Sequence, residues 1–296
     1  MPWLQLSLEV TRDQADIVTE VFESAGALSV TLLDAADEPL LEPAPGEQPL
    51  WGKLRAVALL HSGCDAEAIR DGLRDALQVP EIELLTEHLE DRDWSTIWRD
   101  DFHSMCFGTR LWVCPSNESP PDPDAVVVQM DPGMAFGTGT HATTGLCLEW
   151  LDANTPAGET VIDYGCGSGM LAIAACKLGA SRVYAVDIDP QALIATRDNA
   201  ARNAVEQCIE VMVPDTLDSG PVDVVMANIL ANPLIQFSGM LAGYLRVQGS
   251  IILTGILEVQ GREVMAAYQR WFDFKAPVQR DEWVLLEGVK RAGGKV

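Results

Sequence analysis

Residues 160–174 read TVIDYGCGSGMLAIA, and this stretch decides the fold of the second half of the chain. A short apolar segment runs into a turn with three glycines, and an apolar helical segment leaves the turn. Glycine is needed where the backbone turns tightly and approaches a ligand without a Cβ in the way. Met170 stands at the third position of a pyrophosphate-binding GxGxxG fingerprint counted from Gly165, so the pattern is DxGxGxG. This pattern favours a turn that contacts a flat, charged nucleoside over a turn that only connects a strand tightly to a helix.

Expected strands and helices alternate after residue 126. Strands are expected over residues 160–164, 182–188, 209–213, 222–228 and 250–255, and helices over residues 170–178, 190–203, 233–245 and 258–271. This order predicts a doubly wound parallel sheet of the α/β class, with ligands at the carboxyl ends of the strands. Residues 274–278 and 283–289 predict a terminal hairpin, which would add an antiparallel strand to the sheet.

The first ninety residues predict a separate, smaller domain. Strands are expected over residues 4–10, 27–33, 54–60 and 82–89, and helices between Thr11 and Gly26 and over residues 65–77. The order βαββαβ is typical of a ferredoxin-like α+β domain.

A charged segment, residues 91–104, joins the two parts. Its aromatic residues Trp94, Trp98 and Phe102 are spaced by four and would share one helical face. A linker helix that packs this face on a neighbour is the simpler interpretation, and direct substrate contact is the alternative. The expected domains are therefore residues 1–90, the linker 91–104 and residues 105–296.

The charge of the chain is strongly negative and unevenly placed. The 296 residues, enough for about two domains, carry 44 acidic and 20 basic side chains, a net charge of −24. Residues 1–130 hold 25 acidic and 8 basic side chains, so −17 of this charge lies there. Such a charge weighs against nucleic acid as the main partner. It favours either a solubilising surface or an N-terminal part that meets a basic macromolecule.

The seven cysteines are scattered and include no CxxC pair. This pattern predicts reduced thiols in a cytoplasmic protein, and neither a disulfide framework nor a zinc site. No apolar run approaches the ~20 residues that span a membrane, and the first residues do not resemble a signal peptide. We therefore expect a cytoplasmic protein with no membrane contact and no metal.

Two strand ends carry candidate ligand-binding residues. Asp187 follows an apolar strand, where a carboxylate can accept hydrogen bonds from both hydroxyls of a ribose. Asp189 is its competitor, but it precedes Pro190 and suits a helix N-cap. Asn228 ends another apolar run, where it would orient an amine, hold part of a cofactor or only cap a turn. A ribose-binding acid alone does not separate nicotinamide cofactors from S-adenosylmethionine.

Residues 131–144, DPGMAFGTGTHATT, form a loop rich in glycine and threonine that leads into a helix over residues 145–151. Such a loop can fold over a ligand and offer hydroxyls and helix N-terminal amides to a carboxylate. His141 is the one histidine of this part of the chain, but no Ser or Asp partner lies near it in sequence. A role as general base is therefore disfavoured.

These residues together resemble a known family. DxGxGxG, the acid at the second strand end and Asn228 resemble the Rossmann-like, S-adenosylmethionine-dependent methyltransferases. DPGMAFGTGTHATT, VIDYGCGSGMLAIAA, VDIDPQAL and ANIL, in that order, resemble the ribosomal protein L-eleven methyltransferase family more narrowly. The segments MPWLQLSLEV, WGKLRAV and WSTIWRDDFH extend the resemblance over nearly the whole chain.

The resemblance implies an enzyme that methylates lysine side chains and the N-terminal amine of one ribosomal protein. It places the contacts with S-adenosylmethionine on Thr144, Gly165, Asp187 and Asn228, with Gly167 in the same turn. It also implies that the N-terminal domain recognises the basic substrate and that the linker repositions this domain. Where the family usually has Pro, this chain has Ala142, a strong helix former that should preserve the helix start.

A sulfonium donor is already activated, so we expect the protein to act mainly by positioning the reactants. The lysine, with an ordinary pKa of about 10.4, would be deprotonated by desolvation. Asn228 is uncharged and does not oppose this, so no dedicated base is expected. The alternatives are a methyltransferase acting on RNA or a small amine, an NAD-dependent dehydrogenase and a non-catalytic adaptor. A basic substrate favours a steering role for the negative charge.

Overall fold

The computed structural model describes residues 3–36, 50–89, 103–120, 122–131 and 141–292. The chain divides into two compact units, Met1–Ile97 and Trp98–Val296. The helix expected over residues 91–104, with its three aromatic side chains, lies outside the described residues except for residues 103 and 104.

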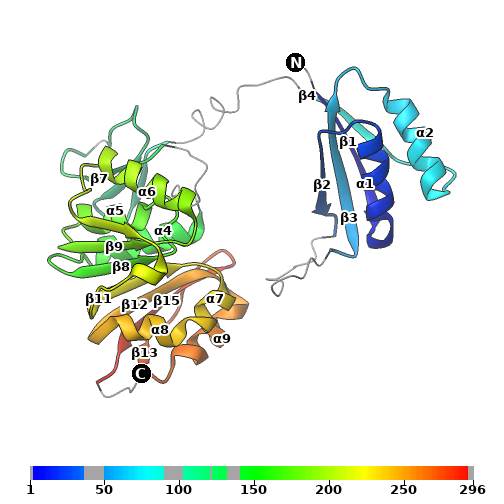
Figure 1. Ribbon diagram of the computed structural model, residues 1–296. Helices are drawn as coiled ribbons and strands as arrows, with labels where there is room; N and C mark the ends of the chain where they lie inside the picture. Colours follow the sequence, from blue (N-terminus) through cyan, green and yellow to red (C-terminus); the bar gives the residue numbers. More distant parts are fainter. Residues whose placement is uncertain (1–2, 37–49, 90–102, 121, 132–140, 293–296) are drawn as a thin grey trace. The chain divides into compact units, whose positions relative to one another are not determined.

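In its described residues, the N-terminal unit is an antiparallel sheet with two α-helices on one face (Figure 1). Its elements are β1 (Trp3–Thr11), a 3-10 turn (Arg12–Gln14), α1 (Ala15–Ser24), β2 (Ser29–Asp34), β3 (Lys53–His61), α2 (Ala66–Leu77) and β4 (Leu85–Leu89). The strands lie in the order β2-β3-β1-β4. Leu4, Leu6 and Leu8 alternate along β1 and pack against Val18 and Phe22 of α1. The period-two apolar pattern thus puts one face of the sheet under the helices, and the expected βαββαβ order is confirmed.

The C-terminal unit is built on a sheet of eight strands. From residue 160 onward its elements are β8 (Thr160–Tyr164), α5 (Met170–Lys177), β9 (Arg182–Val186), α6 (Pro190–Arg202), β10 (Ile209–Met212), a 3-10 turn (Pro214–Thr216), β11 (Val222–Asn228), α7 (Ala231–Gln236), α8 (Ser238–Tyr244), β12 (Leu245–Leu257), α9 (Glu258–Tyr268), β13 (Phe272–Phe274), β14 (Val278–Arg280) and β15 (Trp283–Lys290). The order is β10-β9-β8-β11-β12-β15-β13, with β14 paired to β15. The first five strands are parallel, and β15 is antiparallel to β12, as the terminal hairpin predicted.

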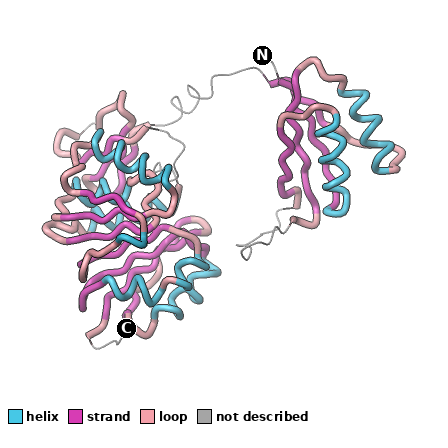
Figure 2. The backbone as a smooth tube through the Cα atoms, viewed as in Figure 1, coloured by secondary structure: helices cyan, strands magenta, loops and turns pink. Residues whose placement is uncertain are grey.

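Helices cover both faces of this sheet (Figure 2). Val161 of β8 packs on the side of α4 (Ala142–Ala153) and α5, whereas the next residue, Ile162, packs with the core of α7, α8 and α9. Central parallel strands alternate in this way because each face is buried under a helical layer. The doubly wound sheet expected from the sequence is confirmed.

Some elements differ from those expected. A second sheet of three strands, β5 (Met105–Phe107), β6 (Leu111–Cys114) and β7 (Val126–Gln129), precedes α4. Strands this short show too little periodicity to be read from sequence. The helix expected over residues 233–245 is divided into α7 and α8 at Phe237. The strand expected over residues 274–278 is wrong for residues 275–277, which lie between β13 and β14.

The prediction of reduced thiols is wrong for one pair, because Cys176 and Cys208 form a disulfide with a Cα–Cα distance of 6.2 Å. Cys176 lies on α5, shortly before β9, and the carbonyl of Cys208 accepts a hydrogen bond from Val183 of β9. The parallel pairing of β9 with β10 therefore brings together two cysteines that are 32 residues apart. The other five cysteines are free thiols, as expected.

Within the described residues, no group of three or more His, Cys, Asp or Glu side chains is arranged to hold a metal ion. None of the helices in this part of the chain is long and apolar enough to cross a membrane.

Candidate active site

The candidate residues gather at one edge of the large sheet. β9, β8 and β11 are adjacent and parallel, so their carboxyl ends lie side by side. Gly165 follows β8, Asp187 follows β9 and Asn228 ends β11. Ligands of open α/β sheets bind at this edge, outside the carboxyl ends of the strands.

The turn after β8 requires its glycines. Gly165, Gly167 and Gly169 have φ values of +81°, +53° and +79°, in the left-handed region that disfavours side chains. A Cβ on Gly165 would lie 2.3 Å from the Cγ2 atom of Ile229, and one on Gly169 would lie 2.8 Å from the Cγ2 atom of Thr196. The left-handed conformation therefore disfavours a side chain at all three positions, and close packing also excludes one at Gly165 and Gly169.

Asp187 is bound directly to this turn. Its Oδ2 accepts a hydrogen bond from the backbone N–H of Gly167 at 2.9 Å, and its Oδ1 accepts one from the N–H of Asp189 at 3.0 Å. Asp189 in turn accepts from the N–H of Gln191 at 2.8 Å and caps α6, with Pro190 in the first turn. The two acids thus have the separate positions that the sequence predicted.

Thr144 and Asn228 are also brought together. Thr144 is buried in the first turn of α4, and its Oγ1 lies 3.5 Å from the donating Nδ2 of Asn228. The next residue, Ile229, packs against Gly165. Thr144 thus contacts Asn228, the neighbour of Asn228 contacts Gly165, and Gly167 of the same turn bonds Asp187. These contacts connect all five predicted site residues. Residues 132–140 of the glycine- and threonine-rich loop lie outside the described part of the chain.

His141 is the N-cap of α4. Its Nδ1 lies 2.7 Å from the Oγ1 of Thr143 and accepts, at 3.4 Å, from the Thr143 N–H. The ring also packs edge-on against Trp283, with ring centroids 4.8 Å apart. These contacts give His141 a role in starting the helix that carries Thr144. As the substitution of Pro by Ala142 predicted, the helix start is preserved.

Asp163 is a candidate that sequence reasoning missed, although it is the first residue of DxGxGxG. Its side chain is 1% exposed, and its Oδ2 accepts from the N–H of Ala172 at 3.0 Å. Its Oδ1 has no hydrogen-bond partner among the described residues. The pKa of Asp163 is raised to about 7, mainly by burial; the hydrogen bond from Ala172 lowers it, and the charge of Asp187 raises it.

Two features together define a methyltransferase domain. The first is the sheet order with antiparallel β15 beside β12, and the second is the hydrogen bond between the glycine turn and the acid at the end of the next strand. A solved structure that resembles this chain is the ribosomal protein L11 methylase from Lactobacillus delbrueckii subsp. bulgaricus. It has a TM-score of 0.58 and 30% identity, over 64% of this chain and 100% of that one.

The family model described as Ribosomal protein L11 methyltransferase (PrmA) matches residues 2–291. The chain therefore belongs to this family. The Ribosomal protein L11 methyltransferase of Aliivibrio fischeri (strain MJ11) is 47% identical over 294 residues, which are 98% of this chain and 100% of the relative. That of Vibrio cholerae serotype O1 (strain M66-2) is 48% identical over 293 residues, 98% of this chain and 99% of the relative. The resemblance inferred from the sequence motifs is confirmed, and the protein is a methyltransferase.

Proposed function

We propose that this enzyme transfers methyl groups from S-adenosylmethionine to ribosomal protein L11, at lysine side chains and the N-terminal α-amine. The observation that carries the proposal is the hydrogen bond from Gly167 to Asp187. It sets a ribose-binding carboxylate beside a glycine backbone that a nucleoside can approach closely. Membership of the family over residues 2–291 supports the choice of substrate. A ribosomal protein substrate would also place the enzyme in the cytoplasm.

The residues at the sheet edge fit S-adenosylmethionine. The turn presents backbone without side chains at Gly165 and Gly167, and the buried Asp163 has an oxygen without a partner among the described residues. When bound, the cofactor supplies an activated methyl group on a sulfonium. In this proposal Asp187 binds the ribose hydroxyls, and Gly165 and Gly167 line the nucleoside. Thr144 and Asn228 hold the methionyl end, and Asp163 compensates its positive charge.

In this proposal the protein positions the substrate amine and removes water from it, and no side chain acts as a dedicated base. Asn228 presents an uncharged amide beside Thr144, so it can accept from the substrate amine without stabilising the protonated form. The apolar Ile229 and Leu230 follow it at the edge of the sheet, and an apolar surrounding lowers the pKa of a lysine. His141 is engaged through Nδ1 with Thr143. In-line placement of the amine then supplies most of the rate.

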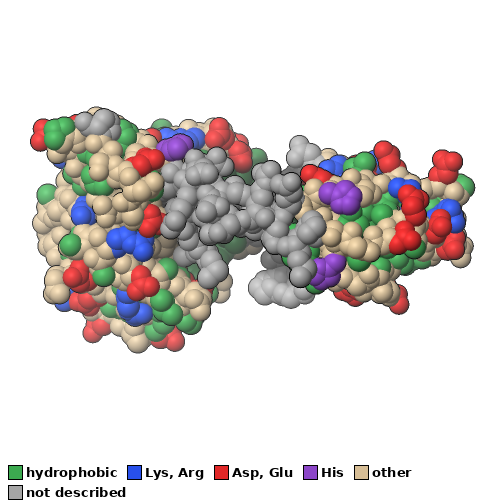
Figure 3. Space-filling view, turned by 90° about the horizontal axis from the view of Figure 1, so that it is seen from above, with side chains coloured by type: hydrophobic (Ala, Val, Ile, Leu, Met, Phe, Trp, Pro, Cys, Tyr) green, Lys and Arg blue, Asp and Glu red, His purple; other side chains and the backbone are tan. Residues whose placement is uncertain are grey.

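The N-terminal unit is proposed to recognise the substrate. Its βαββαβ order and the strand order β2-β3-β1-β4 support a ferredoxin-like domain over residues 1–90, with residues 91–104 as linker and 105–296 as catalytic domain. Its helices expose the acidic residues Asp16, Glu20, Glu23, Glu67, Asp71 and Asp75. Figure 3 shows clusters of acidic side chains on the visible face of this unit. Such a surface attracts a basic protein and repels nucleic acid.

The proposal is tested by incubating the enzyme with methyl-labelled S-adenosylmethionine and total ribosomal proteins, followed by identification of the labelled band. We expect label in L11. Label in ribosomal RNA, or in no ribosomal protein, would contradict the proposal. Calorimetry with NAD in place of S-adenosylmethionine should show no binding.

A further inference from the structure

One polar face of α6 contacts the glycine turn. The Oγ1 of Thr196 donates to the carbonyl of Gly167 at 3.0 Å, and the Nδ2 of Asn199 donates to the carbonyl of Ser168 at 2.9 Å. Two successive carbonyls of the turn are therefore fixed by a helix that lies outside it. Because carbonyl and amide orientations are coupled through the planar peptide, these bonds also fix the amides that the turn presents.

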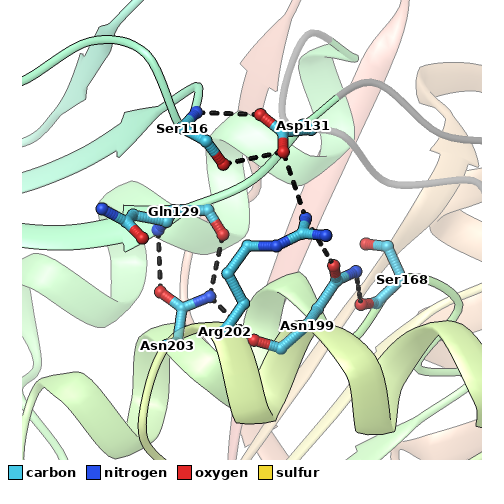
Figure 4. Close-up of polar contacts among 7 residues, drawn as sticks. All are labelled: Ser116, Gln129, Asp131, Ser168, Asn199, Arg202 and Asn203. Carbon is cyan, nitrogen blue, oxygen red and sulfur yellow. Dashed lines mark hydrogen bonds and ion pairs between the residues drawn. The ribbon is translucent and has the colours of Figure 1, made fainter.

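The same face of the helix holds the end of β7 (Figure 4). Asn203, at the carboxyl end of α6, accepts from the N–H of Gln129 at 2.7 Å and donates to its carbonyl at 2.8 Å. It also donates to the carbonyl of Asn199 at 2.9 Å. Asn203 is 3% exposed. Its buried side chain pairs with the N–H and the carbonyl of Gln129, as the backbone of a neighbouring strand would. Loss of buried hydrogen bonds of this kind is costly.

A third contact reaches Asp131, two residues beyond Gln129. Arg202 forms an ion pair with the Oδ2 of Asp131 at 3.3 Å and donates to the Oδ1 of Asn199 at 3.4 Å. Asp131 also accepts from the N–H and the hydroxyl of Ser116 at 2.8 and 2.7 Å. Asp131 is the first residue of the segment that leads along the chain to Thr144.

We infer that Thr196, Asn199, Arg202 and Asn203 form a clamp that positions the glycine turn and the end of β7 relative to each other. Thr196, Asn199 and Asn203 are spaced by three and four residues, as one helical face requires. Asn199 joins the two halves of the clamp, because it bonds the turn through Nδ2 and Arg202 and Asn203 through its oxygens. These residues touch no proposed ligand, so they are positioning residues. The functional consequence, tighter binding of S-adenosylmethionine, rests on the proposed function.

The central variant is Asn203→Ala, with Tyr268→Phe as its control. Tyr268 is buried in α9 and loses one hydrogen bond, to the carbonyl of Leu234, in the variant. We expect Asn203→Ala to weaken S-adenosylmethionine binding roughly tenfold in calorimetry, and Tyr268→Phe to leave it unchanged. At saturating cofactor, kcat with ribosomal protein L11 should change by less than about twofold. Asn203→Asp, which cannot donate to Gln129, should behave like Asn203→Ala.

Arg202 has a matched control on the same helix. Arg197 donates to the carbonyls of Leu193 and Val211 and faces β10. We expect Arg202→Met to weaken cofactor binding two- to threefold, because a solvent-exposed ion pair contributes little to stability. Arg202→Lys should restore the affinity, and Arg197→Met should not change it.

Deuterium exchange of the enzyme without cofactor gives a readout independent of activity. Amides of residues 165–169 should exchange faster in Asn203→Ala than in Tyr268→Phe when both are compared at equal stability. Equal exchange and equal cofactor affinity in the two variants would overturn the clamp. If the unsubstituted enzyme binds no S-adenosylmethionine, the proposed function fails, and the exchange data alone decide on the clamp.

Discussion

The Nδ2 of Asn228 lies 3.5 Å from the Oγ1 of Thr144 and joins the carboxyl end of β11 to the first turn of α4, across 84 residues of sequence. The contact fixes an uncharged amide at the sheet edge where we propose that the methyl group is transferred. The chemistry of the site depends on this absence of charge on Asn228, because a carboxylate there would stabilise the protonated substrate amine.

Asn228→Asp should therefore shift the pH dependence of methyl transfer. The substitution keeps the size of the side chain, and the Thr144 hydroxyl, which accepts from Asn228, can instead donate to the carboxylate. The added charge raises the pKa of the bound amine. The single-turnover rate at neutral pH should fall roughly tenfold per unit of pKa shift and recover at higher pH. Asn232→Asp on α7 is the control for added charge. An unshifted profile in Asn228→Asp would contradict the role of neutrality.

Asp163 should make the stability of the enzyme depend on pH. Burial raises its folded-state pKa to about 7, above the ordinary value of 3.8. The folded protein then holds a proton that the unfolded chain has released, so the stabilisation is full below pH 4 and is lost as pH rises to 7. Asp163→Asn, which does not titrate, should gain stability relative to the unsubstituted enzyme over this range. Urea unfolding at pH 5 and pH 8 measures the difference, and a difference independent of pH would refute the assignment.

Gly165→Ala should impair both folding and cofactor binding. Gly158 provides a matched control, because it has φ +76° against +81° for Gly165, yet no atom lies within 4 Å of its added Cβ. Backbone strain is common to both variants, so the contact with Ile229 accounts for the difference. We expect Gly165→Ala to unfold more easily by a further 1–3 kcal/mol or so and to lose cofactor affinity. Equal denaturation curves for the two variants would mean that Ile229 moves aside freely.

The disulfide between Cys176 and Cys208 should stabilise the C-terminal unit. It closes a loop of 32 residues, for which loop entropy predicts about 3–4 kcal/mol. The double variant Cys176→Ser/Cys208→Ser should show this loss in urea unfolding, and a reductant should cause it in the unsubstituted protein. Cys106→Ser, at a free and exposed thiol, is the control. If the reductant has no effect, the two thiols are not joined in solution.

Salt should weaken the binding of the protein substrate and leave the binding of the cofactor unchanged. The charge of −17 over residues 1–130 would steer a basic protein, and such steering is screened within about 8 Å at physiological ionic strength. The KM for L11 should therefore rise with salt while S-adenosylmethionine affinity stays nearly constant. If both stay constant, the charge serves solubility alone.

Local patterns predicted most of the elements, but not the sheet of β5, β6 and β7. They also indicated which strand ends carry the proposed site residues. The glycines after β8, Asp187 and the helix cap Asp189 are encoded within a few residues of the elements that they join. Contacts between distant residues were not predictable, because the topology makes them: Thr196 with Gly167, His141 with Trp283, and Cys176 with Cys208. Asp163 was overlooked because burial, which sequence does not display, gives this carboxylate its raised pKa.

The most direct test of the proposed activity is intact-protein mass spectrometry of purified ribosomal protein L11 after incubation with the enzyme and S-adenosylmethionine. We expect mass increases of whole methyl groups, located by fragmentation on lysines and the N-terminal amine, and none with the variant Asp187→Ala. L11 of unchanged mass under conditions where the enzyme binds S-adenosylmethionine would contradict the account.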